Sequence, residues 1–413
     1  MPALFFHPPH PPPAMPLRRF RLPTRLGGLS LGALLAACGG GGGGSATDAP
    51  PAPAPAPSSV SVTLTAPAAE EVFEAGSPLT LRAQVTIDGA PAGDGTAVRF
   101  SATSGTLAAA ATAQGGIATA TLTQATPGRQ QLTVSATAAN GQTATATRTV
   151  YLRPAPRPLE VLVPAYFYPS PSGSPWDQLA AGAQAVPDVA VTAILNPSNG
   201  VFTAAEPAYV RAASQFVAAG GQVIGYVHSD YGTRALSAVQ ADVDNYLRLY
   251  GRTIVSGIFV DEMSSEPRQL GYYQALYRHI KAQGSTLRVV GNPGAVPDAA
   301  YAAVADVLVT YEGQRAGLLA YDPRSTTSTA WLYGRPNTSV SVLGHNIATC
   351  AAMQEALAAA ATARYNVGPV FFTDGEYDPV LRTGNPWAGL PRYWTALLQS
   401  VDAVNRGRPL PTC

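Results

Sequence analysis

The sequence predicts an α/β chain, namely a (β/α)8 TIM barrel preceded by an all-β immunoglobulin-like sandwich. Two different spacings of apolar residues along the chain support this prediction. Between residues 59 and 153, apolar residues alternate with polar or small ones at period two, which is typical of half-buried strands. From residue 159 onward, short apolar runs alternate with helical patterns, which indicates parallel βα units. At 413 residues the chain is long enough for two folded domains.

Composition and charge narrow the possible partners. Apolar residues make up 46% of the chain and charged residues 12%, with 40 Gly and 38 Pro, which indicates folded domains joined by Pro/Gly-rich connectors. The formal charge of +1 includes four arginines of an N-terminal segment that we expect to be removed. The remaining charge of about −3 offers no electrostatic basis for binding nucleic acid. We therefore expect no nucleic-acid partner.

Residues 1–38 are predicted to be a lipoprotein signal. A basic stretch at 18–25 precedes an apolar run at 26–37, which is too short to span a bilayer. Its end, Leu35-Ala36-Ala37-Cys38, resembles the lipobox of bacterial lipoproteins, which implies a diacylglycerol anchor on Cys38. Gly39 stands where an Asp would retain a lipoprotein at the inner membrane, so we expect an outer-membrane lipoprotein facing the periplasm or the cell surface. An ordinary secretory signal or an uncleaved anchor is the alternative.

A linker and a β domain follow the signal. Residues 39–58 contain six glycines and a Pro-Ala repeat, which predict a flexible and then extended spacer. In the domain at 59–153, Leu79, Leu81, Ala83 and Val85 alternate with polar neighbours, and Gly-containing turns recur between such runs. The Gly-Thr-Ala-Val-Arg-Phe run at 95–100 resembles bacterial Ig-like domains of invasin type. We expect a spacer, with adhesion to glycan or protein as the alternative.

A Pro-rich linker at 154–158 leads into the barrel domain at 159–413. We predict eight strands, near 159–167, 189–197, 222–229, 255–262, 287–292, 306–312, 339–345 and 367–374. Between them, Thr203 with Glu206 and Ser237 with Gln240 have the spacing of capping boxes at helix starts. Eight βα units in this length indicate a TIM barrel, whose active site lies at the carboxyl ends of the strands. A doubly wound open sheet is the alternative, although no Gly-rich nucleotide loop follows the first strand.

Carboxylates at strand ends suggest chemistry. The apolar run 257–260 ends in Asp261 and Glu262, and the run 307–311 ends in Glu312. A buried parallel strand gains no stability from finishing in paired acids. The alternative is that these acids cap a helix or pair with an arginine. Because Asp261 and Glu262 are consecutive on one strand, they are not expected to share a face, so Glu262 is assigned a supporting role.

The other strand ends carry amides and aromatic rings. They show no Cys/His cluster at metal spacing, no Gly-x-Ser-x-Gly elbow and no Walker loop, so we expect no metal and no cofactor. Two carboxylates beside aromatic rings suit cleavage of a glycosidic bond. Single histidines such as His228 and His345 are interpreted as structural. The candidate substrate-binding residues are Tyr166, Asn196, Tyr226, Tyr231, Arg234, Asn292, Asp374 and Trp387. For Tyr166, Tyr226, Tyr231 and Trp387, packing at the rim is an equal alternative.

Ordered motifs across 159–400 resemble the spherulin-4-like (spherulation-specific) family. They are Val163-Pro164-Ala165-Tyr166-Phe167, Ile194-Leu195-Asn196-Pro197-Ser198-Asn199-Gly200, Gly225-Tyr226-Val227 with Tyr231-Gly232-Thr233-Arg234, Gly257-Ile258-Phe259-Val260-Asp261-Glu262, Asn292-Pro293-Gly294, and Asn385-Pro386-Trp387 with Leu390-Pro391. The resemblance implies a TIM-barrel glycoside hydrolase of family 135, whose fungal members cleave galactosamine-containing polysaccharide at α-1,4-linked N-acetylgalactosamine. According to this resemblance, Asp261, Glu262 and Glu312 correspond to the family's conserved acids. His228-Ser229-Asp230 departs from the expected Thr-centred turn, which bears on substrate specificity.

By analogy with related barrels, Asp261 is assigned as nucleophile and Glu312 as general acid/base, which implies retention of configuration and carboxyl groups about 5–5.5 Å apart. The rival interpretations are a non-catalytic glycan-binding or adhesion lipoprotein and a glycosidase for a different glycan. In an oxidising exported compartment, Cys350 and Cys413 are predicted to form a disulfide. The expected partners are a polysaccharide and, through Cys38, a membrane, and we expect a monomer.

Overall fold

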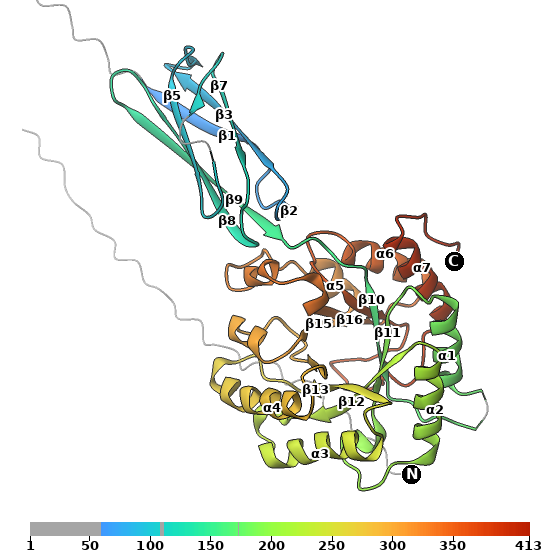
Figure 1. Ribbon diagram of the computed structural model, residues 1–413. Helices are drawn as coiled ribbons and strands as arrows, with labels where there is room; N and C mark the ends of the chain where they lie inside the picture. The colour runs from blue at the N-terminus through green and yellow to red at the C-terminus, as the bar shows by residue number, and fades with distance from the viewer. Residues whose placement is uncertain (1–58, 108–110, 172) are drawn as a thin grey trace, which may run out of the picture. The chain divides into compact units, whose positions relative to one another are not determined.

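The computed structural model describes residues 59–107, 111–171 and 173–413 (Figure 1). Two β-sheets occupy residues 60–153, an arrangement compatible with a sandwich, and a closed barrel with helices begins at residue 160. No helix in these ranges is long and apolar enough to cross a membrane. The predicted lipobox cysteine, Cys38, lies outside the described residues.

The N-terminal sheets are built from strands with alternating burial. In β3, for example, Leu79, Leu81, Ala83 and Val85 are buried, while the residues between them are exposed. One sheet has the order β1-β3-β4 with β7 paired to β3, and the other has the order β2-β9-β8-β5-β6. The strands are β1 Val60–Ala66, β2 Val72–Glu74, β3 Leu79–Ile87, β4 Ala90–Pro91, β5 Ala97–Ala102, β6 Ala111–Thr112, β7 Ile117–Leu122, β8 Gly128–Thr137 and β9 Thr143–Arg153.

Eight parallel strands form the barrel and close it by pairing β10 with β17. The expectation of eight strands in a TIM barrel is confirmed, and each strand lies where an apolar run predicted it. The strands are β10 Glu160–Ala165, β11 Val191–Leu195, β12 Gln222–His228, β13 Val255–Asp261, β14 Arg288–Gly291, β15 Val307–Gln314, β16 Val340–His345 and β17 Pro369–Phe372.

Seven α-helices are assigned in the part of the barrel that the structure describes. Helix α4 shows why they pack on the strands, because Tyr273, Leu276 and Ile280 recur on one face and are all buried. The helices are α1 Pro175–Ala185, α2 Pro207–Ala218, α3 Leu236–Leu249, α4 Leu270–Gln283, α5 Arg315–Ala320, α6 Cys350–Ala360 and α7 Trp394–Asn405. Only a short 3-10 turn, Ala299–Ala303, stands between β14 and β15.

Strand β13, which ends in Asp261, has no room for a side chain at Gly257. A Cβ added to Gly257 in β13 would lie 2.2 Å from the backbone oxygen of Arg288 on the neighbouring strand β14. The next residues, Ile258, Phe259 and Val260, are buried in the barrel core. The apolar run therefore fixes β13 in the sheet and brings Asp261 to its carboxyl end.

The two predicted capping boxes do not form. Helix α2 begins at Pro207, so Glu206 precedes it, and the carboxylate of Glu206 accepts a hydrogen bond from Tyr168 instead. Helix α3 begins at Leu236, and Ser237 lies inside it rather than capping it. The spacing alone was misleading because the helix starts are set by packing and by Pro207, which favours the first turn of a helix.

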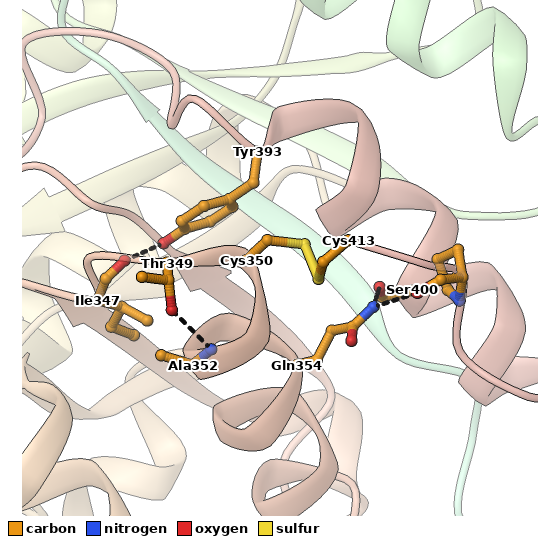
Figure 2. Close-up of a disulfide and its surroundings, with 9 residues drawn as sticks. Ile347, Thr349, Cys350, Ala352, Gln354, Tyr393, Ser400 and Cys413 are labelled. Atoms are coloured by element: carbon orange, nitrogen blue, oxygen red, sulfur yellow. Dashed lines mark hydrogen bonds between the residues drawn. A yellow bond between two sulfur atoms is a disulfide. The ribbon is translucent and has the colours of Figure 1, made fainter.

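Cys350 and Cys413 are joined by a disulfide, with Cα atoms 5.6 Å apart (Figure 2). Cys350 is the first residue of α6, directly after the N-cap Thr349, whose hydroxyl accepts a hydrogen bond from the Ala352 amide. The side chain of Gln354 donates to the Pro411 carbonyl at 2.8 Å. The C-terminal tail is thus fastened to α6 by one covalent bond and one hydrogen bond.

Candidate active site

Three polar side chains meet at the carboxyl ends of three consecutive strands. Asp261 is the last residue of β13, Asn292 directly follows β14, and Glu312 lies near the end of β15. These strands are neighbours in the barrel, so their carboxyl ends open onto the same mouth. Two carboxylates and one amide, far apart in sequence, are therefore placed together by the barrel itself.

The amide of Asn292 bridges the two carboxylates. Its nitrogen donates one hydrogen bond to Oδ1 of Asp261 at 2.8 Å and another to Oε2 of Glu312 at 2.7 Å. Its oxygen accepts from the backbone N–H of Gly294 at 3.0 Å, which fixes which way the amide points. Because the two carboxylate oxygens lie on the same nitrogen, they are no more than about 5.5 Å apart, within the range of retaining glycosidases.

Burial sets the protonation of the pair. It raises the pKa of Glu312 to about 7, with the nearby charge of Asp261 as the second cause, while hydrogen bonds from Asn292 and Trp387 oppose the rise. Burial also raises the pKa of Asp261, against hydrogen bonds from Tyr226, the Glu262 backbone and Asn292. Asp261 thus receives more donors than Glu312. At neutral pH this arrangement favours an ionised Asp261 beside a Glu312 that can hold a proton.

Tyrosines form the wall around Asp261. The hydroxyl of Tyr226 donates to Oδ2 of Asp261 at 2.7 Å, and the Tyr226 ring is buried. Tyr166 packs edge-on against Tyr226 with ring centroids 5.4 Å apart, and its pKa is raised by burial and then by the charges of Asp261 and Glu312. Tyr226 was expected to contact substrate, but its hydroxyl instead holds the carboxylate. Tyr166 is partly exposed.

Glu262 adopts an unusual backbone conformation. Its φ of 50° lies in the left-handed region, which is uncommon for a residue other than glycine. The carbonyl of Glu262 accepts hydrogen bonds from the Tyr231 amide at 2.7 Å and the Ser229 hydroxyl at 2.8 Å, which stabilise this conformation. Burial, followed by the charges of Asp261 and Asp230, raises the pKa of Glu262 to about 7. A third carboxyl group that can be protonated therefore adjoins the pair.

A buried hydroxyl pair braces the turn that holds these acids, and the sequence reasoning missed it. Ser229 is fully buried and donates to the carbonyls of Asp261 and Glu262. Its oxygen lies 2.9 Å from the hydroxyl of Tyr273 on α4, which also accepts from the Ser264 amide. No pattern in the sequence links Ser229 to Tyr273. Their pairing depends on α4 packing under this turn.

Three residues that were expected to contact the substrate interact with other parts of the protein instead. Arg234 forms an ion pair with Asp242 of α3 at 2.5 Å and donates to the His228 carbonyl, so it serves the fold. Asp374 is bound by the side chain of Arg392. Trp387 is only 2% exposed, so its ring offers no open face for stacking on a sugar, and it instead lies close enough to Glu312 to lower the pKa of that carboxyl.

The remaining expected contacts lie at the barrel mouth with different roles. Asn292 was expected to read sugar hydroxyls, but it is buried and its amide is fully used by the carboxylates and Gly294. Asn196, directly after β11, is partly exposed, and its side-chain oxygen has no hydrogen-bond partner. Tyr231 is partly exposed, and the charges of Glu262, Asp261 and Glu312 act on its hydroxyl, which places it near the acids. Tyr231 therefore remains available to a ligand, whereas the side-chain oxygen of Asn196 is itself buried.

The two histidines have structural partners. His228 lies 3.2 Å from the Asn199 carbonyl through Nδ1, and burial lowers its pKa. His345 is buried, pairs with the Asn346 side chain, and also has a pKa lowered by burial. Both rings are therefore neutral at physiological pH and add no positive charge to the site.

Comparison with known proteins gives a family match over most of the barrel. The model of spherulation-specific family 4 (Spherulin4) matches residues 160–401. Spherulin-4 of Physarum polycephalum is 36% identical over 156 residues, which is 38% of this chain and 45% of that protein. The match therefore spans less than half of the length of the Physarum relative.

Solved structures with a similar fold include two carbohydrate-related proteins. Sph3 of Aspergillus clavatus, solved in complex with GalNAc, has 24% identity and a TM-score of 0.49, covering 60% of this chain and 98% of that one. A family 39 glycoside hydrolase of Bacteroides cellulosilyticus WH2 has 12% identity and a TM-score of 0.39, covering 81% of each chain.

Proposed function

The chain belongs to spherulation-specific family 4, and we propose that it is a glycoside hydrolase that uses Asp261 and Glu312 as a retaining carboxylate pair. One observation carries this proposal, namely the Asn292 amide nitrogen, whose two hydrogen bonds hold one oxygen of each carboxylate within about 5.5 Å of the other. An inverting pair needs about 6.5–9.5 Å to admit a water molecule between the acids. The geometry thus favours direct attack by a carboxylate.

In this mechanism Asp261 attacks the anomeric carbon while Glu312 protonates the departing glycosidic oxygen. Tyr226 and Asn292 donate to Asp261, so they keep it ionised and aimed until the covalent intermediate forms. Glu312, with its pKa raised to about 7, starts protonated and becomes the base that activates water in the second step. Each carboxyl group thus has the protonation that its role requires.

For the substrate we propose an amino-sugar polysaccharide with galactosamine or N-acetylgalactosamine units. The support is the family resemblance carried by the sequence motifs, which includes Asp261, Glu262 and Glu312. Tyr231, which is partly exposed, would contact the sugar, and so would Asn196, which is partly exposed although its side-chain oxygen is buried. Incubating the soluble barrel chain with purified amino-sugar polysaccharides and detecting released oligosaccharides by mass spectrometry tests this. Release from only another polymer would reassign the glycan, and release from none would contradict the hydrolase.

A non-catalytic glycan-binding protein is the alternative from another class. A binding site gains nothing from holding two carboxylates against each other with pKa values raised by burial, because each buried acid costs stability. The arrangement therefore favours an enzyme. Polysaccharide binding by the wild-type chain without any bond cleavage would support the alternative.

We further propose that the enzyme is an outer-membrane lipoprotein anchored through Cys38, with residues 39–58 as a spacer and the domain at 59–153 as an Ig-like spacer. The support is the Leu35-Ala36-Ala37-Cys38 motif in the sequence. Cys38→Ser should move the protein from the membrane fraction to the soluble fraction. Unchanged membrane association of this variant would contradict the anchor.

A further inference from the structure

A pocket of about 580 Å³ lies at the end of β15, and we propose that it binds a second sugar unit of the same polysaccharide, away from the bond that is cut. This subsite rests on the proposed glycosidase function. We call it the rim pocket. Its lining comes from Gln314 of β15, Asn346 after β16, and residues of the segment 376–384 after β17.

The rim pocket adjoins the carboxylate pair along one strand. Gln314 is two residues beyond Glu312 in β15, and alternate residues of a strand point to the same face, about 6.6 Å apart. That spacing is comparable with the length of one sugar unit. A glycan whose bond lies at Glu312 therefore reaches the rim pocket with a neighbouring unit.

The wall of the pocket is connected to the site by aromatic packing. The ring of His345 packs edge-on against Tyr377 of the pocket wall and against Trp387, with centroids 6.1 Å and 6.0 Å apart. Trp387 in turn lies close enough to Glu312 to lower the pKa of that carboxyl. One packed group therefore supports both the rim pocket and the general acid.

The far wall is a small hairpin with fixed backbone bonds. Asp378 and Thr383 exchange backbone hydrogen bonds of 2.9 Å and 3.3 Å, and the Asp378 carboxylate accepts from the amides of Val380 and Leu381. The hairpin tip leaves Val380 87% and Leu381 70% exposed. Val380 lines the pocket, so a bound ring would cover an apolar side chain that the fold leaves in water.

The lining chemistry fits a sugar. For ring hydroxyls, Gln314 offers its amide oxygen, Asn346 its amide nitrogen and Thr383 its hydroxyl, because the other half of each amide is bonded to Tyr377. Pro379 and Val380 offer an apolar surface for the C–H face. The lining also includes the acids Glu376 and Asp378, whose carboxylates are hydrogen-bond acceptors for sugar hydroxyl groups. This mixture favours a polar, hydroxyl-rich ligand over an ion or a fully apolar one.

Filling the pocket tests the proposal. Thr383→Trp places a large side chain on the lining, and Leu381→Trp places the same side chain on the same hairpin outside the lining. Both positions are exposed, so neither variant should disturb the core. For an α-1,4-linked N-acetylgalactosamine hexasaccharide, we expect Thr383→Trp to raise KM about tenfold, while Leu381→Trp does not. For the shortest oligosaccharide that is cleaved, both should match the wild type.

Equal effects of the two variants on the hexasaccharide would overturn the subsite, while the hydrolase itself would stand. A binding measurement decides the case in which no cleavage occurs. In full chains carrying Glu312→Gln, calorimetry with the hexasaccharide should show about tenfold weaker binding with Thr383→Trp than with Leu381→Trp. Equal binding, or none in either chain, would overturn the subsite.

Discussion

Asp261 and Glu312 accept hydrogen bonds from the same amide nitrogen, that of Asn292, at 2.8 Å and 2.7 Å. The two acids are 51 residues apart in sequence and meet because β13, β14 and β15 are neighbours in the barrel. Burial raises the pKa of both, and the shared donor limits that rise. Asp261 receives more hydrogen bonds than Glu312, which favours an ionised Asp261 beside a protonated Glu312.

Removing either acid should abolish turnover while leaving the fold intact. Asp261→Asn and Glu312→Gln each keep the side-chain shape, so the fold should be unaffected. We expect each to lower kcat at least about 10³-fold, which lies within the range of about 10²–10⁴-fold typical of a lost general acid or base. Glu262→Gln should cost less, because Glu262 supports the pair. Circular dichroism controls for folding, and near-wild-type hydrolysis by Asp261→Asn or Glu312→Gln would remove that residue from the mechanism.

The pH dependence should follow the protonation of Glu312. The general acid must be protonated, so kcat/KM should fall as pH rises through about 7. In Asn292→Ala both carboxylates lose a donor that favours their ionised forms, so both pKa values rise. Both limbs of the pH–rate profile should therefore move to higher pH. A lowered rate with an unshifted profile would show that Asn292 acts on the fold alone.

Burying Glu312 should make stability depend on pH. Its pKa is about 7 in the folded state against an ordinary value of 4.5, so the folded state binds the extra proton between these values. The free energy of unfolding should therefore fall as pH rises from about 4.5 to 7, by on the order of 1–3 kcal/mol. Glu312→Gln should remove the share of this dependence that comes from Glu312, while Asp261 and Glu262, whose pKa values are also raised, keep theirs. The variant should be more stable than the wild type at pH 8. Equal melting temperatures of the two proteins at pH 8 would contradict it.

The Cys350–Cys413 disulfide should stabilise the C-terminal segment. The bond closes a loop with a sequence separation of 63, for which loop entropy gives about 4 kcal/mol. Reduction should lower the melting temperature of the wild type and leave that of a Cys350→Ala/Cys413→Ala variant unchanged. Mass mapping of unreduced protein that finds free thiols at both positions would contradict the bond.

The barrel could be predicted from the sequence because its signals are local. Buried parallel strands are continuous apolar runs, so β10 to β17 all lie within or next to the predicted ranges. The acids at the ends of two of these runs followed from the same pattern. The sandwich strands followed from period-two alternation, as in β3.

The partners of the site residues depend on packing that no local pattern records. Arg234 is used by Asp242 of α3, and Trp387 is buried because it packs against His345 of β16 and Phe371 of β17. Glu206 has capping spacing but bonds Tyr168. The rim pocket was missed for the same reason, since its lining comes from three separate strand ends.

The stereochemistry of the first product tests the central assignment most directly. Proton NMR of the anomeric signals is recorded in the first minutes of hydrolysis, before mutarotation. It distinguishes a single displacement, which inverts the anomeric configuration, from a double displacement, which retains it. A carboxylate pair held within about 5.5 Å predicts that the first product keeps the anomeric configuration of the substrate. An inverted first product would contradict this account and make Asp261 a general base instead of the nucleophile.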